Sequence, residues 1–117
     1  MKRLYIVVEG QTEEEFVRTM LRPYLFSYGI YDVNSILIRT SKSGRGGFVN
    51  YDHLKNTVMP LLKSQKDDIV VTTFVDYFRI PHNTPFYEQC MQAGCNKDKV
   101  AALEQCIWKD INDRRFV

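Results

Sequence analysis

Two short apolar runs, rich in β-branched residues, predict the buried strands of a sheet. They span Leu4 to Val8 and Ile69 to Val75, and runs without alternation are typical of strands covered on both faces. Residues 33–39 alternate imperfectly between apolar and polar side chains, which favours a strand nearer an edge. The pattern therefore predicts two interior strands and one outer strand.

The first helix is predicted between the strand from Leu4 to Val8 and the strand at residues 33–39. Thr12 and Glu15 form a capping box, and Pro23 is expected to bend or shorten the helix. Its apolar positions repeat at helical spacing and are Phe16, Val17, Met20, Leu21, Tyr24 and Leu25.

Two further helices follow the same spacing. One is expected to open at Asp52 and to kink at Pro60; its buried positions are Leu54, Val58, Leu61 and Leu62. The other runs from about Asp98 to Ile111, with Val100, Leu103, Ile107 and Ile111 on one face. Trp108 lies beside that stripe and is expected in the core.

Strands separated by helices predict parallel pairing, and hence an open, mostly parallel α/β sheet flanked by helices. The 117 residues fit one domain, residues 1–117. Residues 113–117 follow the last helix as a new strand would, so we expect an incomplete sheet and an N-terminal fragment of a longer protein. An exposed edge could pair with another copy of the chain, which makes a homo-oligomer conceivable.

Composition narrows the class of protein. The chain is 44% hydrophobic and 26% charged, and it contains no apolar run near the roughly 18 residues of a membrane helix. We expect a cytoplasmic protein without a membrane partner. Cys90, Cys95 and Cys106 lack zinc-site spacing, which favours buried, reduced thiols.

Acidic residues follow both of the apolar strands. Glu9 comes directly after Val8, and Asp76 directly after Val75. In open α/β sheets, ligands bind beyond the carboxyl ends of the strands, where neighbouring backbones lie about 4.8 Å apart. Gly10 permits a tight turn, after which Glu13 in the first helical turn can point back toward Glu9. Such a carboxylate cluster suits Mg²⁺ or Mn²⁺.

Each acid also has a structural explanation. Glu13, Glu14 and Glu15 lie where a helix N-terminus favours negative charge, and Asp76 could hydrogen-bond its own loop. Glu9 has no capping role, which favours a function for it.

Basic residues offer little further guidance. The net charge of +2 neither demands nor forbids a polyanionic partner, although several cations lie in expected loops or chain ends: Lys42, Arg45, Arg79, Arg114 and Arg115. Arg79 could reach a phosphate beside the metal. Residues 41–47, which include Arg45, lack the Lys-Ser/Thr of a nucleotide-binding loop.

Three segments resemble an uncharacterised bacterial Toprim-like family, a domain of unknown function. They are Val8-Glu9-Gly10-Gln11-Thr12-Glu13-Glu14-Glu15-Phe16, Gly46-Gly47-Phe48, and the stretch from Thr72 to Pro81. The Toprim fold is shared by topoisomerases and bacterial primases, and the family is distantly similar to overcoming-lysogenisation-defect nucleases. Family members continue past Val117.

The resemblance implies a Mg²⁺-dependent phosphoryl-transfer site. Glu9 would be the acid of the first strand, Glu13 a second ligand of the nuclease type, and Asp76 the first aspartate of an Asp-x-Asp pair. Phe78 stands where the second aspartate belongs, which argues against a two-metal mechanism.

Three functions stay open at this point. The first is a metal-dependent nuclease-like domain in which Glu9 and Asp76 hold the ion, Glu13 assists, and Arg45 and Arg79 contact the phosphates of nucleic acid. The second is a non-catalytic scaffold or binding module of a bacterial assembly, such as one for phage defence. The third is a nucleotide-binding regulator that uses residues 41–47.

Overall fold

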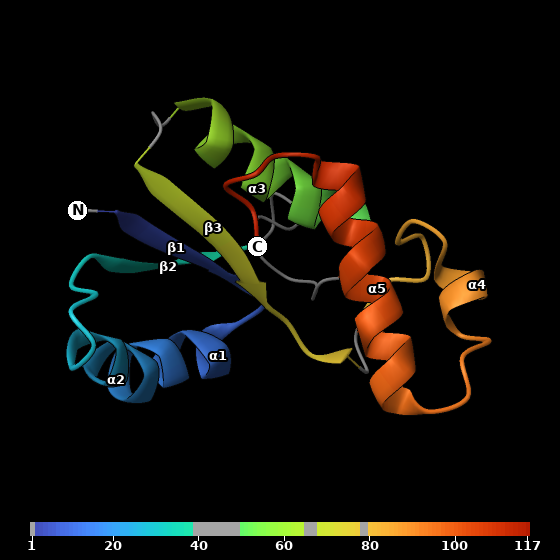
Figure 1. The fold of residues 1–117 in the computed structure, drawn as a ribbon, viewed down its shortest axis with the longest axis horizontal. Coiled ribbons are helices and arrows are strands. Elements are labelled where there is room, and N and C mark those ends of the chain that lie inside the picture. The colour runs from blue at the N-terminus through green and yellow to red at the C-terminus, as the bar shows by residue number, and fades with distance from the viewer. Residues whose placement is uncertain (1, 39–49, 65–67, 78–79) are drawn as a thin grey trace.

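A parallel sheet forms the centre of the computed structural model, which describes residues 2–38, 50–64, 68–77 and 80–117. Within these ranges the sheet has the strand order β2-β1-β3 (Figure 1). Its strands are β1 (Arg3–Val8), β2 (Val33–Leu37) and β3 (Ile69–Phe74). Both pairings of β1 are parallel, so the predicted open α/β fold is confirmed.

Helices cover both faces of the sheet (Figure 1). The elements are α1 (Gln11–Phe16), the π-helix η1 (Val17–Leu21), α2 (Arg22–Phe26), α3 (Tyr51–Ser64), α4 (Tyr87–Cys90) and α5 (Asn96–Ile111). Val17 joins Ile6 and Val8 in a small core beneath α1 to α2. The larger core lies on the other face, where α3 and α5 pack against the sheet. No helix in the described ranges is long and apolar enough to cross a membrane.

The first helix begins directly after Gly10. Gly10 is the N-cap with an extended backbone, and its carbonyl accepts the Glu14 amide at 3.0 Å. Thr12 lies inside the first turn, so the predicted capping box is wrong. The φ of −152° at Gly10 is open to any residue, so the turn does not depend on the conformational freedom of glycine.

The helical segment widens before Pro23 and does not end there. Proline has no N–H to donate and its ring crowds the carbonyl four residues earlier. The preceding residues form η1, in which the Arg22 amide donates to the Val17 carbonyl, five positions back. Helical structure then continues to Phe26. Pro23 therefore changes the hydrogen bonding of the helix.

The apolar stripes of α3 and α5 are confirmed. Both helices bury residues in the larger core, namely Leu54, Val58, Leu62, Leu103, Ile107 and Ile111. Pro60 lies inside α3, which is one helix from Tyr51 to Ser64. The expectation for Trp108 is wrong, since its side chain is 46% exposed and its indole N–H donates to the Phe116 carbonyl at 3.0 Å.

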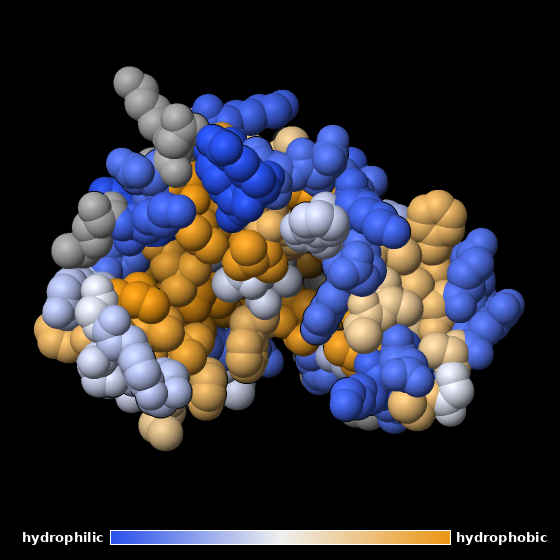
Figure 2. Space-filling model, viewed as in Figure 1, coloured by the Kyte–Doolittle hydropathy of each residue, from blue (hydrophilic) through white to orange (hydrophobic). Residues whose placement is uncertain are grey.

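β3 differs from the predicted interior strand. On its outer side the described residues provide only one parallel bridge, between Val71 and Phe116. Several of its side chains stay partly accessible, and Phe74 is 40% exposed. Figure 2 shows the resulting hydrophobic surface over β3 and toward α1 and α2. Among the described strands only β1 is interior.

Arg115 anchors the C-terminal segment, whereas the sequence had predicted only a basic residue in a loop or at a chain end. Its guanidinium donates to the Leu62 carbonyl at 2.8 Å and to the Asp113 carboxylate at 2.8 and 3.0 Å. Next to it, the Val71 amide donates to the Arg115 carbonyl. These bonds hold residues 113–117 beside β3, as the strand-like expectation for this segment suggested.

The Asp113–Arg115 pair predicts acid sensitivity. Hydrogen bonds from Arg115 lower the pKa of Asp113 to about 2, from 3.8. A carboxylate whose pKa is lower in the folded state than in the unfolded state stabilises the fold at a pH above its unfolded-state pKa. This stabilisation is lost as the pH falls toward 2. We expect this carboxylate to contribute about 1 kcal/mol to the free energy of unfolding at neutral pH, after allowance for solvent screening.

Asp113→Asn should remove this pH dependence of stability in urea unfolding measured at about pH 5 and about pH 2. Asp68→Asn, at an exposed position, should keep the wild-type dependence; equal pH profiles of wild type and Asp113→Asn would contradict the role.

Candidate functional site at the carboxyl edge of the sheet

The register of the strands brings the ends of β1 and β3 together. Val8 pairs with Phe74, so Glu9 and Asp76 each follow a strand at the same edge of the sheet. Glu9 is half-buried and Asp76 is exposed. The sequence correctly predicted that these neighbouring strands would deliver acids to one edge.

Glu9 and Asp76 are in direct contact. The backbone N–H of Asp76 donates to Glu9 Oε2 at 3.4 Å, which is a long hydrogen bond. The bond joins residues that are 67 positions apart in the sequence. It orients the Glu9 carboxylate toward the start of the segment that carries the Asp76 side chain.

Glu13 turns back toward the same edge. A Cβ built on Gly10 would lie 3.4 Å from Glu13 Oε2, so this carboxylate covers the glycine that follows Glu9. Glu13 is half-buried in the first turn of α1, where the helix N-terminus favours negative charge. At this distance a Cβ at position 10 would be in ordinary van der Waals contact with the carboxylate.

Within the described residues, the carboxylates at this edge do not form the metal-binding cluster of three that the sequence predicted. Mg²⁺ usually takes only one or two protein carboxylates and completes its shell with water and substrate phosphate. Glu9 and Asp76 supply two carboxylates at one edge, and Glu13 lies near them. Within the described ranges, no group of three or more His, Cys, Asp or Glu side chains is arranged to hold a metal ion.

An exposed apolar line extends from the acidic edge, and three of its residues are among the helical apolar positions that the sequence predicted. Phe16, Met20 and Tyr24 are 43%, 62% and 58% exposed, whereas Val17, Leu21 and Leu25 pack toward the sheet. Phe16 stacks on Phe74, with ring centroids 5.6 Å apart. Tyr28, at 69% exposure, continues the line and contacts Tyr24 at 5.1 Å between ring centroids.

The aromatic pair lies close to the acids along both chain segments. Phe16 is three residues after Glu13 on one helix, a spacing that puts both on one face. Phe74 precedes Asp76 by two residues on β3. No local pattern in either segment identifies the pair, because the two rings meet only when the helix packs beside the end of β3.

Several predicted residues lie outside the described ranges. They are Arg45 and Arg79, the Gly46-Gly47-Phe48 segment, the rest of residues 41–47, and Phe78. The phosphate contacts, the glycine-rich loop and the broken Asp-x-Asp pair therefore stay predictions.

The fold and the edge residues define an open parallel α/β domain with acidic side chains at the carboxyl ends of two adjacent strands. The chain belongs to the family described as Domain of unknown function (DUF4276), which matches residues 8–117. No curated protein and no solved structure matches the chain.

Proposed function

We propose that this chain is a Toprim-like, Mg²⁺-dependent phosphoryl-transfer domain that acts on nucleic acid as a nuclease does. The observation that supports it best is the contact between Glu9 and the backbone of Asp76 at the carboxyl edge of the sheet. Glu9 is half-buried and directly follows an apolar strand, at the edge where Asp76 follows the adjacent strand, and a charged residue in such a position is a candidate for function.

In the proposed site, Glu9 and Asp76 hold the cation and Glu13 assists. The ion, when bound, polarises a phosphodiester and lowers the pKa of a water nucleophile. Glu9 keeps its orientation through the Asp76 amide, and Glu13 would add negative charge beside Gly10. Arg45 and Arg79 are the candidates for contacts to substrate phosphates.

Nucleic acid is the favoured substrate class because an exposed aromatic line extends from this edge. Bases stack on exposed aromatic rings with little dependence on sequence. Phe16 and Tyr24 offer such rings. A single strand could place its bases on these rings, next to the carboxylates that would hold the cation.

The direct test is cleavage of labelled single- and double-stranded DNA and RNA with Mg²⁺ or Mn²⁺, with and without EDTA. We expect metal-dependent products from at least one substrate. Calorimetry with each metal alone tests the site independently of the choice of substrate. Absence of both metal binding and cleavage would contradict the proposal.

Phe16→Ala should weaken single-strand binding. Stacking of one base is worth roughly 1–3 kcal/mol, so the dissociation constant should rise roughly five- to a hundredfold. The measurement is fluorescence anisotropy of a labelled oligonucleotide in EDTA, which separates binding from cleavage. Phe26→Ala is the matched control, because Phe26 is 60% exposed at the far end of the same helical segment. Equal affinities of wild type and Phe16→Ala would show that Phe16 is not a stacking site.

The alternative is a non-catalytic scaffold module of a bacterial assembly. It is favoured by the same exposed line, since Phe16, Met20, Tyr24 and Tyr28 would also suit the apolar core of a protein interface. In this case the hydrogen bond between Glu9 and Asp76 only joins the ends of two strands. The scaffold predicts neither metal binding nor metal-dependent cleavage, and oligonucleotide affinity that does not depend on Phe16.

A further inference from the structure

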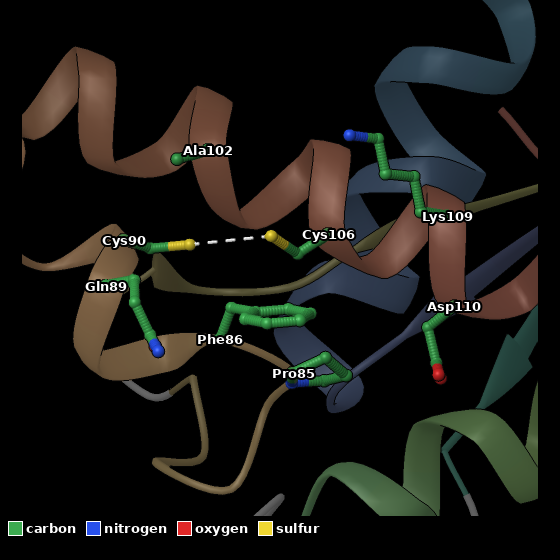
Figure 3. A pocket seen from close by; sticks show the side chains of 8 residues that line it. All are labelled: Pro85, Phe86, Gln89, Cys90, Ala102, Cys106, Lys109 and Asp110. Carbon is green, nitrogen blue, oxygen red and sulfur yellow. Dashed lines mark hydrogen bonds between the residues drawn. The ribbon is translucent and has the colours of Figure 1, made fainter.

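A second candidate site lies away from the acidic edge, between α4 and α5. It is a cavity of about 540 Å³ whose walls are mainly apolar. Pro85, Phe86 and Cys90 line it from the α4 side, and Ala102 and Cys106 from α5 (Figure 3). Glu9, Glu13 and Asp76 are absent from the described lining, so this cavity is independent of the proposed active site.

Two thiols point toward one another in this cavity (Figure 3). Cys90 Sγ and Cys106 Sγ are 3.7 Å apart, and the residues are separated by 16 positions in the sequence. A disulfide bond is about 2.05 Å long, so the sulfurs must approach by roughly 1.7 Å. Side-chain rotation with a small displacement of α4, which is only four residues long, can supply this movement.

The surroundings distinguish the two sulfurs. Cys90 is 5% exposed, and burial raises the pKa of its thiol. Cys106 is only half-buried. A molecule about as small as water fits easily in a cavity of this volume, and Cys106 is the more accessible sulfur for it. The earlier expectation of buried thiols is confirmed for Cys90 and is wrong for Cys95, which is exposed.

We propose that Cys90 and Cys106 form a reversible redox site, at which a small peroxide oxidises both thiols to a disulfide that joins α4 to α5. The Cys106 thiolate attacks one peroxide oxygen; the O–O bond breaks, Cys106 becomes a sulfenic acid, and hydroxide leaves. The Cys90 sulfur, as it loses its proton, then attacks the Cys106 sulfur and displaces the hydroxyl group as water. Overall, two thiols and one hydrogen peroxide give one disulfide and two waters. Two molecules of a small thiol then reduce this disulfide by exchange and are themselves joined as a disulfide.

The cross-link would restrict the least regular part of the described fold. α4 follows Phe86, whose φ of 60° is unusual for a bulky residue, so tertiary contacts hold this short helix in place. Tyr77, next to Asp76, also reaches this region, since its hydroxyl lies 3.8 Å from the sulfur of Met91. The disulfide would therefore fix α4 on α5 and limit motion of the chain between β3 and α4.

The test uses the full chain with Cys95→Ser. Cys90 and Cys95 share one tryptic peptide, residues 80–97, while Cys106 lies in residues 100–109, so this substitution makes the assignment unique. After treatment with hydrogen peroxide, the monomer should yield the two peptides as one disulfide-linked species that dithiothreitol separates. The oxidised monomer should melt roughly 5–15 °C higher than the reduced one.

A second variant separates the cross-link from general oxidation. Cys106→Ser should show no rise in Tm and no disulfide within the monomer between the two peptides. Its Cys90 and Cys95 should be oxidised slowly or should form disulfides between molecules. Two results would overturn the proposal. One is a monomer of Cys95→Ser that stays free of a disulfide while its thiols are oxidised to sulfinic acids; the other is a Cys106→Ser protein whose Tm rises as much as that of Cys95→Ser.

Discussion

Glu9→Gln together with Asp76→Asn is expected to abolish Mg²⁺ and Mn²⁺ binding and, with it, cleavage of nucleic acid. Both substitutions keep the shape of the side chain and remove one negative charge. Glutamine at position 9 can still accept the hydrogen bond from the Asp76 amide, so the fold at this edge should persist. We expect metal affinity to fall at least roughly tenfold and the cleavage rate at least roughly a hundredfold. Calorimetry and single-turnover cleavage measure the two effects separately.

Glu15→Gln is the matched control for this prediction. Glu15 lies on the same helix as Glu13 and also loses one negative charge, but it is exposed. Metal binding by Glu15→Gln should therefore equal that of the wild type. If the double variant binds metal and cleaves as well as the wild type, the carboxylate site is refuted; if neither the wild type nor the variant binds metal or cleaves, the scaffold alternative is preferred.

Leu54→Ala is expected to give the largest loss of stability. Leu54 is fully buried in the larger core, where α3 packs on the sheet. Truncation of a buried leucine removes apolar burial and leaves a cavity, which costs about 3 kcal/mol in the free energy of unfolding. In a domain of this size, Tm should fall by roughly 10 °C or more. Urea unfolding and thermal melting followed by circular dichroism measure the change.

Leu37→Ala provides the same chemical change at an accessible position. Leu37 ends β2 and is 42% exposed, so its truncation should cost less than about 1 kcal/mol. Similar losses in the two variants would mean that the core around Leu54 relaxes to fill the space, or that α3 contributes little to the fold.

Local sequence patterns determined the architecture of this protein. The apolar runs of β1 and β3, the weaker alternation of β2 and the apolar stripes of α3 and α5 each depend on short-range periodicity. Such patterns are readable because a buried strand or helix face must be apolar over its whole length. Parallel order followed from the alternation of strands and helices. The same rule put Glu9 and Asp76 at one edge, because parallel strands share their carboxyl ends.

Other features depended on which neighbours were present. Phe16, Met20 and Tyr24 have the spacing of core residues, yet they are exposed, because the helix turns Val17, Leu21 and Leu25 toward the sheet. Periodicity identifies an apolar helix, but the apolar stripe of that helix can be wider than the surface that packs against it. In the same way, β3 has the composition of an interior strand, but among the residues that the structure describes its outer side forms a single bridge, with Phe116.

Contacts between distant segments were decided by the tertiary structure alone. The Cys90–Cys106 approach, the Phe16–Phe74 stack and the bond from Arg115 to Leu62 all join segments whose local sequences contain no trace of the partner. The capping box at Thr12 illustrates the reverse case, in which a correct local motif was not used because the turn at Gly10 started the helix earlier. The sequence by itself determined the strands, the longer helices and the edge at which the acids meet. The packing of α1 to α2 and of α4 on α5 decided which side chains remain accessible there, because exposure is a property of the neighbours that a residue acquires on folding.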